Sequence, residues 1–228
     1  MEEEEYQNLG EISLAHFGVL FLDELPEFNK NTLELMRQPL EDEKVTISRI
    51  NSTLTYPCNF IFISSMNPCP CGYYGSKDKE CSCSPEQISR YIGKISGPLL
   101  DRIDIHIEVS PVKYDKLENN IISESSIEIK KRVDEARKIQ HERYKEYKIF
   151  SNSELTPNLI EKYCKLNQEC KKILKIAFDK LGLSARAYGR ILKVARTIAD
   201  LELSENIMEV HLAEAIQYRS LDRKYWKN

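Results

Sequence analysis

Two short apolar runs in the first half of the chain are each followed by polar residues. Residues 19–22 are Val-Leu-Phe-Leu and lead directly into Asp23 and Glu24, and the apolar run within residues 59–65 leads to Asn67. Continuous apolar runs of this length are typical of strands buried on both faces of a parallel sheet. We therefore predict two parallel strands with polar side chains at their carboxyl ends.

The segments around these runs have other patterns of hydrophobic and polar residues. Residues 45–48 and 54–56 are β-rich and flank a polar tip at 49–52, which predicts a β-hairpin. The alternation of isoleucine and valine from Ile103 to Val109 predicts a further strand. Residues 31–40 predict a short helix that Pro39 should end or kink, and residues 85–92 predict another.

The second half of the chain has a helical pattern. Residues 123–147 are highly charged with few apolar positions, as in a solvated helix, and several amphipathic helices follow from residue 156. The strongest of these covers 185–201, with one apolar face formed by Tyr188, Ile191, Leu192, Ala195, Ile198 and Ala199. We predict an α/β part over residues 1–112, a helical connector over 113–150 and an all-helical lid over 151–228.

Composition narrows the class of protein. The chain has 228 residues, of which 41% are hydrophobic and 30% are charged, as in soluble globular proteins. No apolar run approaches the ~20 residues that span a bilayer, and the acidic start differs from a signal peptide, so we expect a cytoplasmic protein without a membrane partner. The net charge is −3, but residues 151–228 hold 14 Lys/Arg against 10 Asp/Glu, which permits nucleic-acid binding.

The Asp23-Glu24 pair is the first candidate for chemistry. Adjacent carboxylates at the end of an apolar strand are a Walker B signature, in which Asp23 would bind Mg²⁺ and Glu24 would polarise the attacking water. The plainer interpretation is a strand followed by an acidic helix cap. The sequence contains no G-x-x-x-x-G-K-[ST] phosphate loop, so we expect no ATP binding by this chain alone.

Four of the seven cysteines are the second candidate. Cys69, Cys71, Cys81 and Cys83 form a C-x-C-x9-C-x-C pattern in a segment rich in Pro, Gly and Ser. Four thiolates match the ligand count of a structural Zn²⁺ site, which would hold together a loop that has no apolar core. Free or transiently oxidised thiols are the alternative.

Several longer phrases resemble one family. Residues 38–42, 66–75, 95–106 and 183–200 are similar to the magnesium-chelatase-like AAA+ ATPases of the ComM/YifB type, and the resemblance extends from Gly10 to Arg223. It implies a partial P-loop NTPase core with a β-hairpin before the sensor 1 strand, followed by the helical lid. Members of this family carry a Lon-protease-like domain and a Walker A loop, neither of which occurs in this sequence.

The resemblance also implies roles for single residues. Asn67 matches sensor 1, which contacts the water or the γ-phosphate, although a turn residue before Pro68 would look the same. Arg102 matches the arginine finger that enters the nucleotide site of the next subunit, with a salt bridge to Asp101 or Asp104 as the alternative and Arg90 as the second candidate. Arg186 matches the sensor 2 arginine, for which Arg190 is the other candidate.

The function implied by the resemblance is that of a hexameric ATPase with ATP and Mg²⁺ as cofactors. Such an enzyme would remodel DNA, by branch migration or helicase action during natural transformation, and Arg49 with Lys44 on the hairpin would contact the DNA. A solvated loop is an equally good interpretation of that hairpin tip. Two other functions remain open: a non-catalytic, zinc-stapled module that joins a hexamer, and the ATPase subunit of a metal chelatase.

Overall fold

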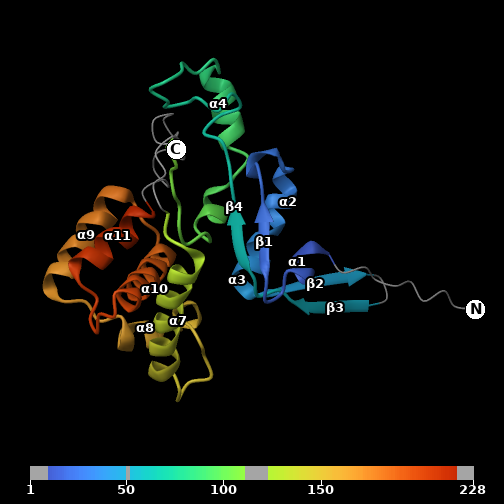
Figure 1. The fold of residues 1–228 in the computed structure, drawn as a ribbon. Coiled ribbons are helices and arrows are strands. Elements are labelled where there is room, and N and C mark those ends of the chain that lie inside the picture. Colours follow the sequence, from blue (N-terminus) through green and yellow to red (C-terminus); the bar gives the residue numbers. More distant parts are fainter. Residues whose placement is uncertain (1–9, 50–51, 111–122, 220–228) are drawn as a thin grey trace, which may run out of the picture. The chain divides into compact units, whose positions relative to one another are not determined.

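A computed structural model describes residues 10–49, 52–110 and 123–219. The chain divides into two compact units, with the division between Ile103 and Asp104, and each unit is described by itself (Figure 1). The predicted boundary at residue 112 lies outside the described residues, and the predicted division between a connector and a lid at residue 150 stays a prediction.

The first unit contains the two predicted parallel strands. Strand β1 (Val19–Leu22) pairs in parallel with β4 (Ile61–Ser64), and Leu22 lies opposite Ser64 (Figure 1). The pairing is confirmed, but burial on both faces is wrong: the alternate residues Val19, Phe21, Ile61 and Ile63 are exposed. Within the described residues this sheet has two strands, which is too few to cover both faces.

The predicted hairpin is also confirmed. Strand β2 (Lys44–Arg49) pairs with β3 (Ser52–Pro57) in an antiparallel ladder. The hydroxyls of Thr46 and Thr55 lie 3.0 Å apart across it. The tip at residues 50 and 51 lies outside the described residues, as does the side chain of Arg49.

The predicted helix at 31–40 is interrupted one turn earlier than expected. Helix α2 (Lys30–Leu35) ends at Met36, and α3 (Arg37–Asp42) contains Pro39 as its third residue. Pro39 does not end the helix, because the first N–H groups of a helix have no acceptor within it and a missing one is tolerated. The remaining helices of this unit are α1 (Glu11–Leu14), the 3₁₀ turn η1 (Leu25–Glu27), α4 (Pro85–Ile92) and α5 (Gly97–Leu100).

The predicted strand at 103–109 is wrong. The described backbone there is irregular, and the His106 N–H donates a hydrogen bond to the Tyr218 carbonyl over 2.9 Å. Ile107 and Val109 are 66% and 84% exposed. Alternation specifies a strand only where a neighbouring strand takes up the hydrogen bonds of its backbone, and the described residues provide none here.

The second unit is helical. It contains α7 (Ser126–Arg143), the 3₁₀ turn η2 (Asn152–Glu154), α8 (Pro157–Tyr163), α9 (Gln168–Leu181), α10 (Ala185–Leu201) and α11 (Glu209–Gln217). Helix α10 matches its predicted bounds and buries the predicted apolar face apart from Tyr188, which is 45% exposed. Its residues form a core with the neighbouring helices, including Leu174, Ile207 and Leu212. Among the described helices, none is long and apolar enough to cross a bilayer.

Candidate functional site

Asp23 and Ser65 meet where the two parallel strands end. Because Leu22 and Ser64 are paired, the next residue of each strand emerges at the same edge of the sheet. The Ser65 hydroxyl donates a hydrogen bond to Asp23 Oδ1, and the Ser65 carbonyl accepts one from the Leu25 N–H over 2.9 Å. The Asp23 carboxylate is therefore held by the neighbouring strand.

Glu24 has an unusual backbone conformation. Its φ of 50° and ψ of 52° lie in the left-handed region, which costs a non-glycine residue about 1 kcal/mol or more. Its N–H lies 3.1 Å from Asp23 Oδ1 and 3.4 Å from the Ser65 hydroxyl. Asp23 and Glu24 are both exposed, and exposed carboxylates are ligands that suit a hard cation such as Mg²⁺.

Asn67 is exposed two residues beyond Ser65. Its side-chain oxygen would lie 3.9 Å from a Cβ placed on Gly72, a residue with φ of +82°, so the cysteine-containing loop folds back against it. Burial raises the pKa of the Tyr91 phenol, against the smaller opposing effect of the Asn67 backbone. Asn67 thus lies between the strand end and the loop.

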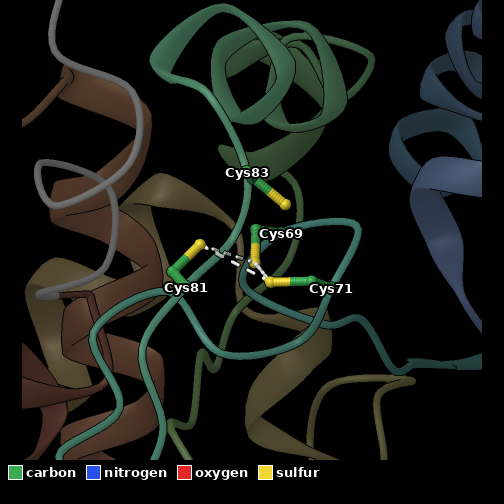
Figure 2. A group of neighbouring side chains, drawn as sticks. All are labelled: Cys69, Cys71, Cys81 and Cys83. Carbon is green, nitrogen blue, oxygen red and sulfur yellow. Dashed lines mark hydrogen bonds between the residues drawn. The ribbon is translucent and has the colours of Figure 1, made fainter.

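The four cysteines predicted as metal ligands are together (Figure 2). All four Sγ atoms lie within 4.8 Å of one another. The Sγ atom of Cys69 is 3.4 Å from that of Cys71 and 3.7 Å from that of Cys81, and the Cys71 and Cys81 sulfurs are 3.5 Å apart. A tetrahedron with Zn–S bonds of about 2.3 Å has sulfur atoms about 3.8 Å apart, so the cluster fits Zn²⁺.

The thiols of the cysteine cluster differ in their pKa values. A backbone hydrogen bond from Tyr73 lowers the pKa of Cys71 to about 5, against desolvation. The pKa of Cys81 is raised to about 12: the Cys83 backbone lowers it, but desolvation and the thiols of Cys71 and Cys69 together raise it further. Ionising one thiol therefore opposes ionisation of the next, and a divalent cation offsets that repulsion.

Arg102 is paired within its own unit. Its Nε atom lies 3.1 Å from Glu41 Oε2, its Nη1 atom donates to the Pro98 carbonyl over 2.6 Å, and its side chain is 10% exposed. Glu41 was not among the ion-pair partners that the sequence offered, which were Asp101 and Asp104. Arg90, the other candidate for this role, is exposed in the last turn of α4.

The two arginines of α10 that are candidates for sensor 2 differ in their surroundings. Arg190 Nη1 lies 2.7 Å from Asp104 Oδ1, and 21% of the Arg190 side chain is exposed. Arg186 is exposed in the first turn of α10, whose N-cap Ser184 accepts a bond from the Ala187 N–H. The exposure of Arg186 favours it over Arg190 for reaching a ligand.

Sequence reasoning missed Ser65 and Glu41. Ser65 could have been found, because it follows its strand just as Asp23 follows the paired strand. Glu41 is far along the chain from Arg102, and no local pattern indicates their contact.

Comparison with known proteins places these features in a family. The model of the magnesium chelatase subunit ChlI matches residues 3–117, and the model of the C-terminal part of that subunit matches residues 123–219. The chain therefore belongs to the magnesium-chelatase-like family.

Three relatives show which members of this family the chain resembles. The chain is 45% identical over 215 residues to the uncharacterized protein YifB of Salmonella typhimurium and 46% identical over 215 residues to competence protein ComM of Haemophilus influenzae. It is 34% identical over 212 residues to the uncharacterized protein Mb2921c of Mycobacterium bovis. These alignments cover 94%, 94% and 92% of this chain, which spans 41% of the length of each relative.

Proposed function

We propose that this chain supplies the Mg²⁺- and water-positioning part of an ATPase that acts on DNA. The observation that carries the proposal is the junction at the strand ends, where the neighbouring strand holds Asp23 and both carboxylates are exposed. Asp23 would orient the metal ion, and Glu24 would accept a proton from the attacking water. The Mg²⁺-nucleotide, when bound, supplies the phosphoryl group.

The other residues act on charge and orientation. Asn67 would orient the attacking water through its side-chain amide, and Arg186, or Arg190 after leaving Asp104, would contact the nucleotide from the lid. Arg102 would offset charge on the phosphoryl group bound by a neighbouring copy, which is the role that requires a ring such as a hexamer. For that, Arg102 must leave both Glu41 and the Pro98 carbonyl, and the Glu41 side chain, which is 37% exposed, can then be hydrated by water.

The proposed partner is DNA. One relative is named a competence protein, and branch migration or helicase action during natural transformation is the DNA process we propose. On this chain the β2–β3 hairpin offers Lys44 and Arg49 on one strand, and positive side chains of this kind contact phosphates.

We also propose that the four cysteines bind Zn²⁺. Their support is the fit between the observed Sγ separations and a tetrahedral site. Metal analysis of the purified chain should find about one Zn²⁺ per chain, and the double variant Cys81→Ser, Cys83→Ser should lose it. Equal zinc in both proteins would contradict this site. The matched control Cys164→Ser, Cys170→Ser should keep its zinc.

The ATPase proposal is tested in a chimera, because the chain spans 41% of its relatives. This chain replaces the matching segment of the Haemophilus influenzae protein, and ATP hydrolysis is measured with and without DNA. Glu24→Gln should lower the rate about 100-fold or more, since it removes the proton acceptor. Glu27→Gln, the same change at an exposed residue three positions on, should leave the rate unchanged.

The outcomes separate the candidate functions. Equal hydrolysis by the Glu24→Gln chimera and the unaltered chimera would overturn the proposal. Hydrolysis that DNA neither stimulates nor requires would favour the ATPase subunit of a metal chelatase. A chimera that assembles into rings and binds zinc but hydrolyses no ATP would favour the zinc-stapled assembly module.

A further inference from the structure

The helical unit contains an open groove whose lining includes none of the residues proposed for hydrolysis. The groove has a volume of about 830 Å³ and lies between α8, α9 and the first half of α10. Its lining is mainly apolar and includes Ile160, Cys164, Leu174, Phe178, Tyr188 and Leu192. An apolar hollow at the surface of a chain of this composition marks a place where another molecule binds.

Helix α9 forms one wall and presents two rows of side chains to the groove. Leu174 and Phe178 are four residues apart, as are Lys171 and Lys175, and all four line the groove. Side chains at this spacing lie on the same face of a helix, with Cβ atoms about 5–6 Å apart. An apolar row therefore runs beside a basic row along one wall.

The rest of the lining is buried at its base and open at its rim. Cys164 and Leu192 are 4% and 2% exposed, whereas Tyr188 is 45% exposed. The rings of Phe178 and Tyr188 meet edge to face, with centroids 5.9 Å apart and planes at 68°. The groove thus has a well-packed apolar base that side chains of another molecule can reach from solvent.

The charge on the groove is mostly positive. Its charged lining residues are Lys165, Lys171 and Lys175 against Glu161. Within the part of the chain that the structure describes, none of these three ammonium groups has an ion-pair partner, whereas the neighbouring Lys172 pairs with Glu169 over 2.8 Å. The complementary occupant carries carboxylates beside apolar side chains.

We propose that this groove binds the apolar face of an acidic amphipathic helix from a partner protein. Side chains such as leucine, at i, i+3 and i+4 of that helix, would pack against Leu174 and Phe178. Carboxylates at i and i+4 would reach Lys171 and Lys175, because two helices lying side by side have the same rise per residue. Lys165, between α8 and α9, would pair with a further carboxylate. The inference is independent of ATP hydrolysis and concerns a partner other than DNA.

Single-stranded nucleic acid is the other anionic partner that an apolar groove can bind. Its bases stack on exposed aromatic rings. In the described lining, Tyr188 is the exposed ring, and Phe178 is half-buried with its neighbour against it edge to face. The buried base consists of Cys164, Leu174 and Leu192, which suits aliphatic side chains better than bases.

The test uses the whole chain and a synthetic helical peptide labelled with fluorescein. The peptide has leucines on one face, glutamates beside them at i and i+4, and alanine and glutamine elsewhere. Fluorescence anisotropy measures its binding, and circular dichroism measures its helix content. Three further probes are compared: the peptide with serine for every leucine, the peptide with glutamine for every glutamate, and single-stranded oligothymidine.

We expect saturable binding of the acidic peptide with a gain of helix. The double variant Lys171→Glu, Lys175→Glu should weaken it about tenfold, because two attractive contacts become repulsive. The matched control Lys172→Glu, Lys180→Glu makes the same charge change on α9 outside the groove lining and should bind as the unaltered chain does. All four lysines are exposed, so both variants should keep the urea midpoint of the unaltered chain. The serine and glutamine probes should each bind about tenfold more weakly.

Four results would overturn the inference, and none of them bears on the proposed ATPase. The first is equal affinity of the two double variants for the acidic peptide, which would place its site elsewhere. The second is equal binding of the serine and leucine probes, which would show that charge alone acts. The third is no saturation at about 1 mM chain, a concentration that detects even weak complexes. The fourth is tighter binding of oligothymidine that Lys171→Glu, Lys175→Glu abolishes, which would make the groove a nucleic-acid site.

Discussion

At the scale of single residues, Asp200 is a buried charge with several hydrogen-bonding partners. Its side chain is 0% exposed and meets two arginines: Arg143 Nη1 lies 2.9 Å from Oδ2, and Arg196 Nε lies 3.1 Å from Oδ1. Asn152 Nδ2 donates to Oδ2 over 2.9 Å. Burial alone would lower the pKa of Arg143, but the hydrogen bonds that Arg143 donates to Asp200 raise it above its ordinary value.

Removing the Asp200 carboxylate should cost much of the stability of the second unit. Asp200→Ala leaves two arginines without their partner, one of them 2% exposed, and breaking a buried pair in this way costs about 3–5 kcal/mol. Urea unfolding measures the loss. Asp134→Ala is the control, since its ion pair with Lys130 is exposed and such pairs contribute about 0–1 kcal/mol. Equal midpoints for the two variants would contradict the buried-network interpretation.

Cys164 should make the free energy of unfolding fall at high pH. Its thiol is 4% exposed, and burial raises its pKa from 9.0 to about 11, against the opposing charges of Arg196 and Arg143. The unfolded thiol ionises above about pH 9 while the folded one stays neutral. The contribution to stability is therefore complete below pH 9 and is lost as pH rises from 9 to 11.

The expected loss is about 3 kcal/mol, from 1.36 kcal/mol per unit of pKa difference over two units. Unfolding in urea at a series of pH values measures it. Cys164→Ala should show a shallower decline between pH 9 and 11, because the remaining decline comes from groups such as Tyr144. An unchanged slope in that variant would mean that Cys164 is ionised in the folded chain.

At the scale of elements, two glycines have opposite roles in the helical unit. Gly182 follows α9 with φ of +56° and donates its N–H to the Phe178 carbonyl over 2.9 Å, as a left-handed helix cap does. Gly189 lies inside α10, where a Cβ would meet Ile160 Cδ1 at 3.6 Å, an ordinary contact distance.

Substituting each glycine with alanine should therefore change stability in opposite directions. Gly182→Ala should lower the free energy of unfolding by about 1 kcal/mol, since alanine is strained at positive φ. Gly189→Ala should raise it by about 0.5–1 kcal/mol, since alanine is the better helix former. Each change is measured as a shift of the midpoint of urea unfolding, with the slope of the unfolding free energy against urea concentration unchanged. A stable Gly182→Ala chain would show that the cap relaxes at no cost.

The helices and strands also show how much of the fold could be predicted from the sequence. Strands β1 and β4, the hairpin and α10 were predictable from the local pattern of apolar and polar residues, although the two-sided burial expected of β1 and β4 was wrong. The error at 103–109 arose because pairing depends on a neighbour that periodicity does not reveal. The cysteine cluster was predictable from the number and type of its possible metal ligands, whereas the Arg102–Glu41 pair joins residues 61 positions apart and follows only from the fold.

At the scale of the whole molecule, the two units are stabilised in different ways. The helical unit has an apolar core formed by residues of several helices, and it also contains the buried hydrogen-bond network around Asp200. The described part of the other unit has two separate two-stranded sheets, and its four-cysteine loop begins just after Asn67. Units with their own cores unfold independently unless a large interface joins them, so the two should respond to different perturbations.

Metal removal should therefore destabilise one unit and leave the other unchanged. Hydrogen exchange read by mass spectrometry should show faster exchange in peptides covering residues 61–95 after chelation, because thiolate ligation offsets the entropy of ordering that loop. Peptides covering residues 185–217 should not change. Asp200→Ala should give the reverse pattern, with faster exchange at 185–217 and none at 61–95. If chelation speeds exchange in both regions, the two units unfold as one and the cysteine cluster stabilises the whole chain.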